Sequence, residues 1–232
     1  MNVLGEACLP LMLQLIVVVS ADWNAVDGTL YCYQRSNAAH SWELFELPIP
    51  VALGKHGMAW GRGLYDLTDQ PGLHKEEGDG RSPAGLFSLG TVFGDASHQI
   101  HAKNMPFLFV TDDLECIDDP HSKYYNQFVT ASSIVSPDWN SSEKMMEIGS
   151  LYALGLVVEH NLNPIKSGMG SAIFMHIWRG KGIGTHGCTV MQEKDLNRIV
   201  SWLRKEQHPC LVQLPIEIYK NRQSQWNMPE IP

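Results

Sequence analysis

Four consecutive β-branched residues, Ile16 to Val19, are the feature that most limits the folds open to this chain. They end an apolar run that begins at Leu11, and a turn-like Asp27-Gly28 pair follows. β-Branched side chains lose rotamer freedom in a helix and pack well on a pleated sheet. We therefore expect a first core strand here, leading into a second strand at Thr29–Arg35.

The same apolar run has a second interpretation, as an export signal. Val19-Ser20-Ala21 places small residues where a signal peptidase could cut, but no Lys or Arg precedes the run as an export signal requires. The run is also too short to span a membrane, so we expect no integral membrane domain. Residues 1–12 are taken as an N-terminal segment that could be the remnant of an export signal.

Short apolar runs broken by turn residues continue along the chain and indicate more strands. Glycines recur between Gly54 and Gly94, a composition that predicts ordered loops along one wall of a cleft. The other strands that we expect are a third one before Leu53, a buried one at Pro106–Thr111, and Leu154–Glu159, Ala172–Ile177 and Cys210–Tyr219.

Two helices are expected. Apolar residues spaced i, i+3, i+4, i+7 from Leu196 predict an amphipathic helix over Gln192–Lys205. Ser141-Ser142-Glu143 is typical of the cap of a short helix. With no internal repeat and no linker, the sequence predicts a single, mainly β domain over residues 13–220 with a few helices, followed by a polar C-terminal tail at 221–232.

Charge and cysteine content exclude several classes of protein. The formal net charge is -8 and no Lys/Arg run is present, which argues against nucleic-acid binding. A small-molecule or peptide substrate fits better. The five cysteines are too dispersed for a disulfide scaffold, and no CxxC pair suggests a structural zinc site.

The segment from Ile173 to Cys188 has the strongest chemical signal. A predicted strand ends at His176, a glycine-rich loop follows, and Cys188 then precedes the predicted helix. A nearby imidazole or a helix N-terminus lowers the pKa of a thiol and makes it nucleophilic. Gly187 leaves room for backbone amides to form an oxyanion hole.

A bland alternative is that His176 and Cys188 are packing residues, as most single His and Cys residues are. The glycines around them contribute little apolar surface and cost backbone entropy, so packing alone is a poor explanation. A metal site formed with His186 lacks a further ligand at suitable spacing. We therefore expect a nucleophile and a base, with no metal and no cofactor.

Two motifs resemble a known family. Thr185-His186-Gly187-Cys188 resembles the [Ser/Thr]-His-Gly-Cys signature of L,D-transpeptidases of the YkuD type, and His176 matches the histidine upstream of it. The stretch from Ser82 to Phe87 resembles the Thr-Pro-x-Gly-x-Phe stretch of the family. The wider resemblance runs from about Leu13 to Leu214 and implies an L,D-transpeptidase-like β-sandwich.

The resemblance also implies an activity in cell wall biogenesis and cell shape. Cys188 would attack the L-to-D bond of a peptidoglycan tetrapeptide stem, and His176, oriented by the backbone carbonyl of Ile177, would take the thiol proton. Gly187 and Cys188 would supply oxyanion amides. Transfer of the acyl group to an amine makes a cross-link, and transfer to water makes an L,D-carboxypeptidase or amidase. The substrate implies the periplasm or cell envelope.

Substrate contacts are expected around His176 and Cys188. A guanidinium group binds a carboxylate, such as those of the stem peptide, through two hydrogen bonds. Arg179 follows the base, and Trp178 beside it could line the cleft or fill the core. His186 could tune the thiolate or only shape the loop. The other candidates, each with a loop-bracing alternative, are Arg62 and Arg81 as carboxylate partners and Asp119, Tyr125 and Asn126 as a polar rim.

The sequence departs from the signature in two ways. The interval from His176 to Cys188 is shorter than in the commoner version, and Val190 stands where Arg or Asn often follows the cysteine. Both departures affect what the resemblance implies about specificity for the acceptor of the acyl group. A hydrolase and a non-catalytic wall-binding module remain alternatives, and an unrelated cysteine peptidase lacks its usual signatures.

Overall fold

In the computed structural model, which describes residues 11–232, the β-branched run forms the central strand β1 (Gln14–Ser20). β1 pairs parallel with β13 (Cys210–Pro215) and antiparallel with β2 (Asp27–Gln34), and every one of its residues is buried. β3 (Glu43–Ala52) continues the sheet beyond β2. The prediction of a first core strand is therefore confirmed, and residues 1–10 lie outside the described part of the chain.

The longest strand, β5 (Ser82–Gly94), belongs to both halves of the fold. Its first half pairs with β13, and its second half pairs with β10 (Leu154–Val158). β11 (Phe174–Ile177) follows β10, and β12 (Thr189–Met191) follows β11. The short strands β4 (Met58–Trp60) and β6 (Phe107–Phe109) pair with opposite ends of β5.

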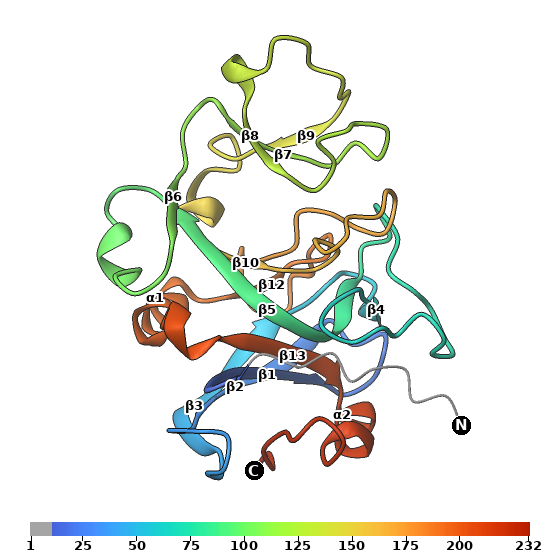
Figure 1. Cartoon of the computed structure of the whole chain (residues 1–232), viewed down its shortest axis with the longest axis vertical. Helices are drawn as coiled ribbons and strands as arrows, with labels where there is room; N and C mark the ends of the chain where they lie inside the picture. Colours follow the sequence, from blue (N-terminus) through green and yellow to red (C-terminus); the bar gives the residue numbers. More distant parts are fainter. Residues whose placement is uncertain (1–10) are drawn as a thin grey trace.

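The ten-stranded sheet folds back on itself in two layers that share β5, seen as the long green strand in Figure 1. One pair, Val190 and Ala52, joins β12 to β3 at the opposite margin. Two short α-helices, α1 (Glu193–Trp202) and α2 (Ile216–Arg222), are present in the described chain. The prediction of a single, mainly β domain with a few helices is confirmed.

A separate three-stranded sheet lies at one end of the molecule, at the top of Figure 1. It has the order β8-β7-β9, and we call it the cap sheet. Its strands are β7 (Leu114–Ile117), β8 (Phe128–Thr130) and β9 (Ser142–Lys144), and short 3-10 turns occur at η1 (Gln99–His101), η2 (Ala131–Ser133), η3 (Gly149–Tyr152) and η4 (Lys205–Gln207).

Buried apolar side chains form two clusters. The larger one fills the space around β1, β5, β13 and α1. The second lies between the cap sheet and the main sheet, where Phe93 packs edge-on against Phe174 with ring centroids 5.0 Å apart. This second cluster also contains Cys188, so the cap sheet and the predicted nucleophile share one interior.

The expectation of loops throughout residues 54–94 is wrong for the part that forms β5. Glycine in this strand does not mark a loop; it permits another chain segment to approach closely. A Cβ added at Gly94 would lie 2.4 Å from the carbonyl oxygen of Ala153 in the turn before β10. Glycine inside a strand often marks such an approach.

Two other local predictions are wrong. The residues after Ser141 form strand β9, because Glu143 and Lys144 pair with β7 and tertiary pairing outweighs local capping preference. The last strand ends at Pro215, which has no N–H for a sheet ladder and precedes α2.

One helix prediction is confirmed, and one strand prediction is correct only in part. The helix predicted over Gln192–Lys205 is confirmed as α1. The strand predicted at Pro106–Thr111 exists as β6, but it lies at a sheet edge with Phe109 exposed, so the expectation that it is buried is wrong.

The C-terminal segment 221–232, expected as a polar tail, packs on the core. Trp226 is buried and stacks on Tyr65 with ring centroids 4.5 Å apart. The Tyr219 hydroxyl donates a hydrogen bond of 2.7 Å to the carbonyl oxygen of Pro229. The apolar residues of this segment therefore contribute to the domain.

Replacing Ile16 with alanine tests the role of β1. Ile16 is fully buried, so we expect Ile16→Ala to lower the free energy of unfolding by about 2–5 kcal/mol through lost burial and a residual cavity. Leu47→Ala on β3, where the side chain is 75% exposed, should change it by less than about 0.5 kcal/mol. Urea unfolding followed by tryptophan fluorescence measures both; equal effects would contradict a core role for β1.

Candidate active site

The parallel ladder of β11 and β12 positions the two predicted catalytic side chains. Its register pairs Met175 with Thr189 and His176 with Val190, which puts Cys188 opposite Phe174. Alternate residues of a strand share a face, so the side chains of Cys188 and His176 lie on the same face of the sheet, on neighbouring strands and two residue positions apart along the ladder. Both side chains are buried.

Backbone groups from the strand β11 region hold the thiol. The N–H of Phe174 donates to Sγ of Cys188 at 3.3 Å, and the thiol donates to the carbonyl oxygen of Ala172 at 3.5 Å. Among residues 11–232, no hydrogen bond joins Sγ to the imidazole of His176. Proton transfer between them therefore requires a displacement of at least one of the two side chains.

Thr185 shapes the turn that presents Cys188. Its hydroxyl donates to the carbonyl oxygen of Cys188 at 2.6 Å and accepts the N–H of Gly187 at 3.1 Å. Gly187 has a φ of +154°, and a Cβ there would lie 3.1 Å from the carbonyl oxygen of Arg81. The turn thus requires glycine at this position, and the Gly187 amide expected in the oxyanion hole is bonded to Thr185.

The residue after Cys188 begins strand β12, and α1 starts only at Glu193. The expectation that Cys188 immediately precedes a helix is therefore wrong, and a helix N-terminus does not act on its thiol. The reason is that Val190 and its neighbours complete the sheet between β11 and β3 before the helix begins.

His176 has the tautomer that a base needs. Its Nδ1 donates to the carbonyl oxygen of Ile177 at 2.8 Å, the bond that the family resemblance implied. This bond leaves the lone pair on Nε2. Burial lowers the pKa of His176 to about 4, against the opposing effect of the Ile177 and Leu151 carbonyls, so the ring is neutral at pH 7.

The thiol is neutral as well. Burial raises the pKa of Cys188 above its ordinary value, and the carboxylate of Glu143 raises it further. The expectation that a nearby imidazole lowers the pKa of this thiol is therefore wrong for this arrangement, since desolvation disfavours both charged forms. The resting pair is a neutral thiol beside a neutral imidazole.

Carboxyl groups near the thiol were not predicted from the sequence. Glu143 on β9 accepts a hydrogen bond from the hydroxyl of Tyr152, whose ring lies edge-on to His176 with centroids 4.9 Å apart. Glu77 accepts hydrogen bonds from Tyr125 and Ser171. The sequence offered no periodicity or spacing that connects these residues to Cys188.

Lys75 was also not predicted from the sequence. Its side chain is buried beside the Cys188 turn, with Cε 3.7 Å from the position of a Cβ at Gly187. Its Nζ is paired with Asp79 at 2.6 Å. This charge lowers the pKa of Cys188, an effect smaller than the effects of burial and of Glu143.

The three residues predicted as a polar rim are occupied by contacts within the protein. Asn126 donates to the carbonyl oxygens of His160 and Asn161 and accepts the N–H of Ala172, which connects its loop to the segment before β11. Tyr125 is buried against Glu77. Asp119 accepts the N–H groups of His121 and Asn140, and these bonds lower its pKa to about 2.

The predicted arginines lie in different surroundings. Arg62 donates to the side chain of Asn161, and Arg81 donates to the carbonyl oxygen of Met58, so both brace loops. Arg179 is exposed and close enough to His176 to lower its pKa. Trp178 is partly buried against the second cluster, and His186 is exposed.

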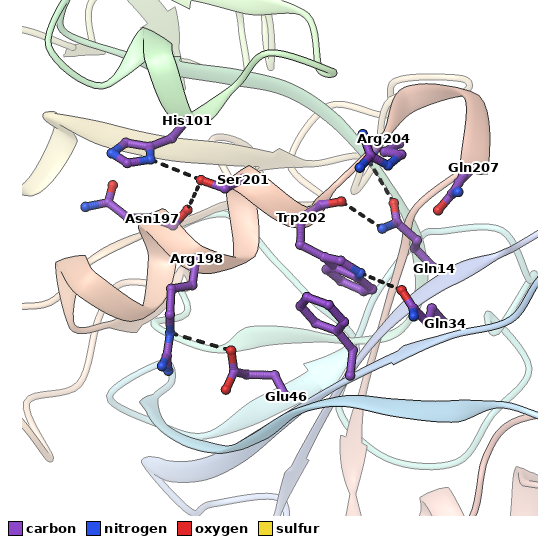
Figure 2. A pocket seen from close by; sticks show the side chains of 11 residues that line it. Gln14, Gln34, Glu46, His101, Asn197, Arg198, Ser201, Trp202, Arg204 and Gln207 are labelled. Atoms are coloured by element: carbon purple, nitrogen blue, oxygen red, sulfur yellow. Dashed lines mark hydrogen bonds and ion pairs between the residues drawn. The ribbon is translucent and has the colours of Figure 1, made fainter.

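An open pocket of about 560 Å³ lies away from this site, between α1 and strands β1 to β3 (Figure 2). Its side chains mostly bond to one another: the Trp202 indole donates to Gln34, and Arg198 pairs with Glu46. Within residues 11–232, no three His, Cys, Asp or Glu side chains are grouped to hold a metal ion. No helix in that range has the length and apolar character needed to cross a membrane.

One of three comparisons with known proteins agrees with the motif assignment. The sequence model of the YkuD family, described as the L,D-transpeptidase catalytic domain, matches residues 19–218. Comparison with curated proteins finds no match. Among solved structures, the helical cell shape determining protein Pgp2 from Campylobacter jejuni matches 87% of this chain and 48% of its own, at 12% identity and a TM-score of 0.40. The chain spans about half the length of that protein.

The alkylation of Cys188 tests its electrostatic environment. Because burial raises the pKa of this thiol, we expect its alkylation rate to keep rising at pH values above the ordinary thiol pKa, without a plateau near neutrality. Iodoacetamide labelling of the native protein, quantified by mass spectrometry on the peptide that contains Cys188, measures this profile. The urea-unfolded protein is the control, and a plateau below pH 7 in the native protein would mean a lowered pKa.

Proposed function

Because the chain belongs to the family of L,D-transpeptidase catalytic domains, we propose that it is a cysteine-dependent peptidoglycan L,D-transpeptidase. Cys188 is the nucleophile and His176 is the base. The observation that carries the proposal is that thiol and imidazole share one face of the β11–β12 ladder, and that the bond from Nδ1 to the Ile177 carbonyl leaves the ring's lone pair on Nε2.

The first half-reaction is acylation of Cys188. As Nε2 of His176 takes the thiol proton, sulfur attacks the carbonyl carbon of the L-to-D bond in a tetrapeptide stem. The carbon–nitrogen bond then breaks, and the imidazolium returns the proton to the amine of the departing D-alanine. A thioester remains on Cys188. A neutral resting pair suits this sequence, since the charges form only when the substrate is bound.

The negative charge that develops on the carbonyl oxygen during the attack must be stabilised by hydrogen-bond donors. The backbone amides of Cys188 and Gly187 are the candidates, and Gly187 must share or release its bond to Thr185 to serve. Thr185 would then hold the turn through its second bond, to the carbonyl oxygen of Cys188. His186 is exposed beside this turn and fits a loop-shaping role.

A stem peptide must reach a thiol that the cap sheet covers. We infer that binding displaces the cap sheet or the adjoining glycine loop. Arg179 and Trp178 are the best placed substrate contacts, because Arg179 is exposed near His176. The remaining candidates, Arg62, Arg81, Asp119, Tyr125 and Asn126, would have to give up their present hydrogen bonds.

The second half-reaction decides the product. Attack of an acceptor amine on the thioester gives a cross-link, whereas attack of water gives an L,D-carboxypeptidase or amidase. A wall-binding module without activity would have no use for an intact thiol and base. The substrate lies outside the cytoplasmic membrane, so the proposed place of action is the periplasm or cell envelope.

The nucleophile is tested by incubation with a disaccharide-tetrapeptide. Wild-type protein should gain the mass of the acyl group and release D-alanine, and Cys188→Ala should do neither, because the thioester cannot form. Intact-protein mass spectrometry measures both species. Cys210→Ala, which removes another buried thiol, should acylate normally, and we expect the same of variants at Cys32, at Cys116 and at Cys8, which lies outside the described residues. Acylation of Cys188→Ala would refute the assignment.

The base is tested by a matched pair of histidine variants. His176→Gln should slow acylation by about 10²-fold or more, the usual value of general base assistance. His186→Gln should slow it much less, because that side chain is exposed and makes no recorded hydrogen bond in the described chain. The rate of D-alanine release under single-turnover conditions measures the difference. A larger loss for His186→Gln would reverse the two roles.

A further inference from the structure

Glu143 faces the nucleophile from the cap sheet. The register of β7 and β9 puts Glu143 opposite Cys116, so the two side chains lie on the same face of the cap sheet. Cys116 packs in the same apolar cluster as Cys188. The carboxylate of Glu143 is therefore directed at the interface where the thiol lies, near enough to raise the pKa of Cys188.

Tyr152 fixes this carboxylate relative to the base. Its hydroxyl donates to Oε2 of Glu143, and its ring lies edge-on against the imidazole of His176. Tyr152 is itself buried at the end of η3. Oε1 of Glu143 has no hydrogen-bond partner among residues 11–232, so one oxygen remains for a group that enters the site.

The surroundings of Glu143 have an excess of negative charge. The carboxylates of Asp118 and Glu77 both act on it, and burial together with their charges raises the pKa of Glu143 to about 7, against the Tyr152 hydrogen bond. Oδ1 of Asp118 is buried without a partner in the described chain. The cation of Lys75 nearby is already paired with Asp79. Among the other titratable groups, Tyr152 bonds to the Glu143 carboxylate, and His176 packs against the Tyr152 ring. The charge of Glu143 in turn acts on the thiols of Cys116 and Cys188, and Lys144 is its chain neighbour on β9.

An ammonium group entering between the cap sheet and Cys188 would meet these unpaired carboxyl oxygens. An amine can attack a thioester only after it has lost its ammonium proton. Near neutral pH, a carboxyl with a pKa of about 7 is present in both forms and can accept and later release a proton.

We propose that Glu143 is the base on the acceptor side: its carboxylate binds the ammonium of the incoming amine and takes one proton from it. This inference rests on the proposed function and deepens it, since it separates the acceptor step from acylation. His176 serves the thiol, and Glu143 serves the amine.

The proton balance of the step is complete. The acceptor ammonium carries three protons, of which one passes to Glu143 before nitrogen attacks the thioester carbon. The carbon–sulfur bond then breaks, and a second proton passes through Nε2 of His176 to the sulfur of Cys188. The third stays on the new amide nitrogen. Glu143 afterwards releases its proton to solvent, and no oxidant, reductant or metal is needed.

Water brings no ammonium, so hydrolysis of the thioester does not require Glu143. The ratio of cross-linked to hydrolysed product therefore tests the proposal, because loss of a purely structural residue would not change this ratio. Glu143→Gln should acylate from a disaccharide-tetrapeptide no more slowly than wild type, because removal of the Glu143 charge lowers the pKa of Cys188. Transfer to an ammonium acceptor, a second tetrapeptide stem, should fall about 10²-fold or more, so the ratio of cross-linked to hydrolysed product should fall with it.

Hydroxylamine is the matched chemical control, because it is mostly unprotonated at pH 7.5 and needs no base to become a nucleophile. Glu143→Gln should transfer the acyl group to hydroxylamine as fast as wild type does. The matched protein control is Glu115→Gln, an isosteric change on β7 of the same cap sheet, where the carboxylate bonds Trp139 and Ser142. It should leave every rate unchanged.

The outcomes are distinct. Slower acylation by Glu143→Gln, or equal losses with stem peptide and hydroxylamine, would overturn the inference in favour of a structural role. An unchanged product ratio would overturn it as well. If wild type forms no acyl-enzyme, the proposed function fails and takes this inference with it, whereas a normal acylation with a normal product ratio in Glu143→Gln would refute only the inference.

Discussion

The short parallel ladder between β11 and β12 is the interaction on which the chemistry of this protein depends. Three residue pairs place Cys188 and His176 on one face of the sheet. Neither strand is held by this ladder alone: β11 pairs with β10, and β12 reaches β3 through Val190 and Ala52. Because β10 is in turn held by β5, the geometry of the site is fixed by the closure of the whole sheet.

Burial is the second constraint, and it acts on charge. The cap sheet covers the thiol and the imidazole, and in this poorly solvated space both charged forms are disfavoured. The same space holds the carboxyl of Glu143, whose pKa burial raises to about 7. One interface thus keeps the thiol and the imidazole neutral and leaves the Glu143 carboxyl in both of its forms near neutral pH, so protons can move between a substrate and the protein.

Local sequence patterns predicted some elements of this fold correctly and others wrongly. The β-branched run at Ile16–Val19 favoured strand β1 over an export signal, because four such residues pack well on a pleated sheet. The glycines of β5 were misleading, since glycine serves both turns and close approaches, and only the position of Ala153 shows which applies at Gly94. Glu143 looked like part of a helix cap and is a strand residue, because its pairing partner Cys116 is distant in the sequence.

The sequence by itself determined the mainly β class, the helix after the motif, and the two residues proposed as nucleophile and base, because these rest on local patterns: periodicity, turn residues and a short motif around Gly187. The tertiary structure decided the environment of that pair. Protonation depends on how far each group is from water and on which charges are near, and those neighbours come from strands distant in the chain. Lys75, Glu143 and Tyr152 lie close enough to act on Cys188 or to feel its charge only because the loop before β5, strand β9 and the turn η3 come together beside it, and no spacing along the sequence encodes that arrangement.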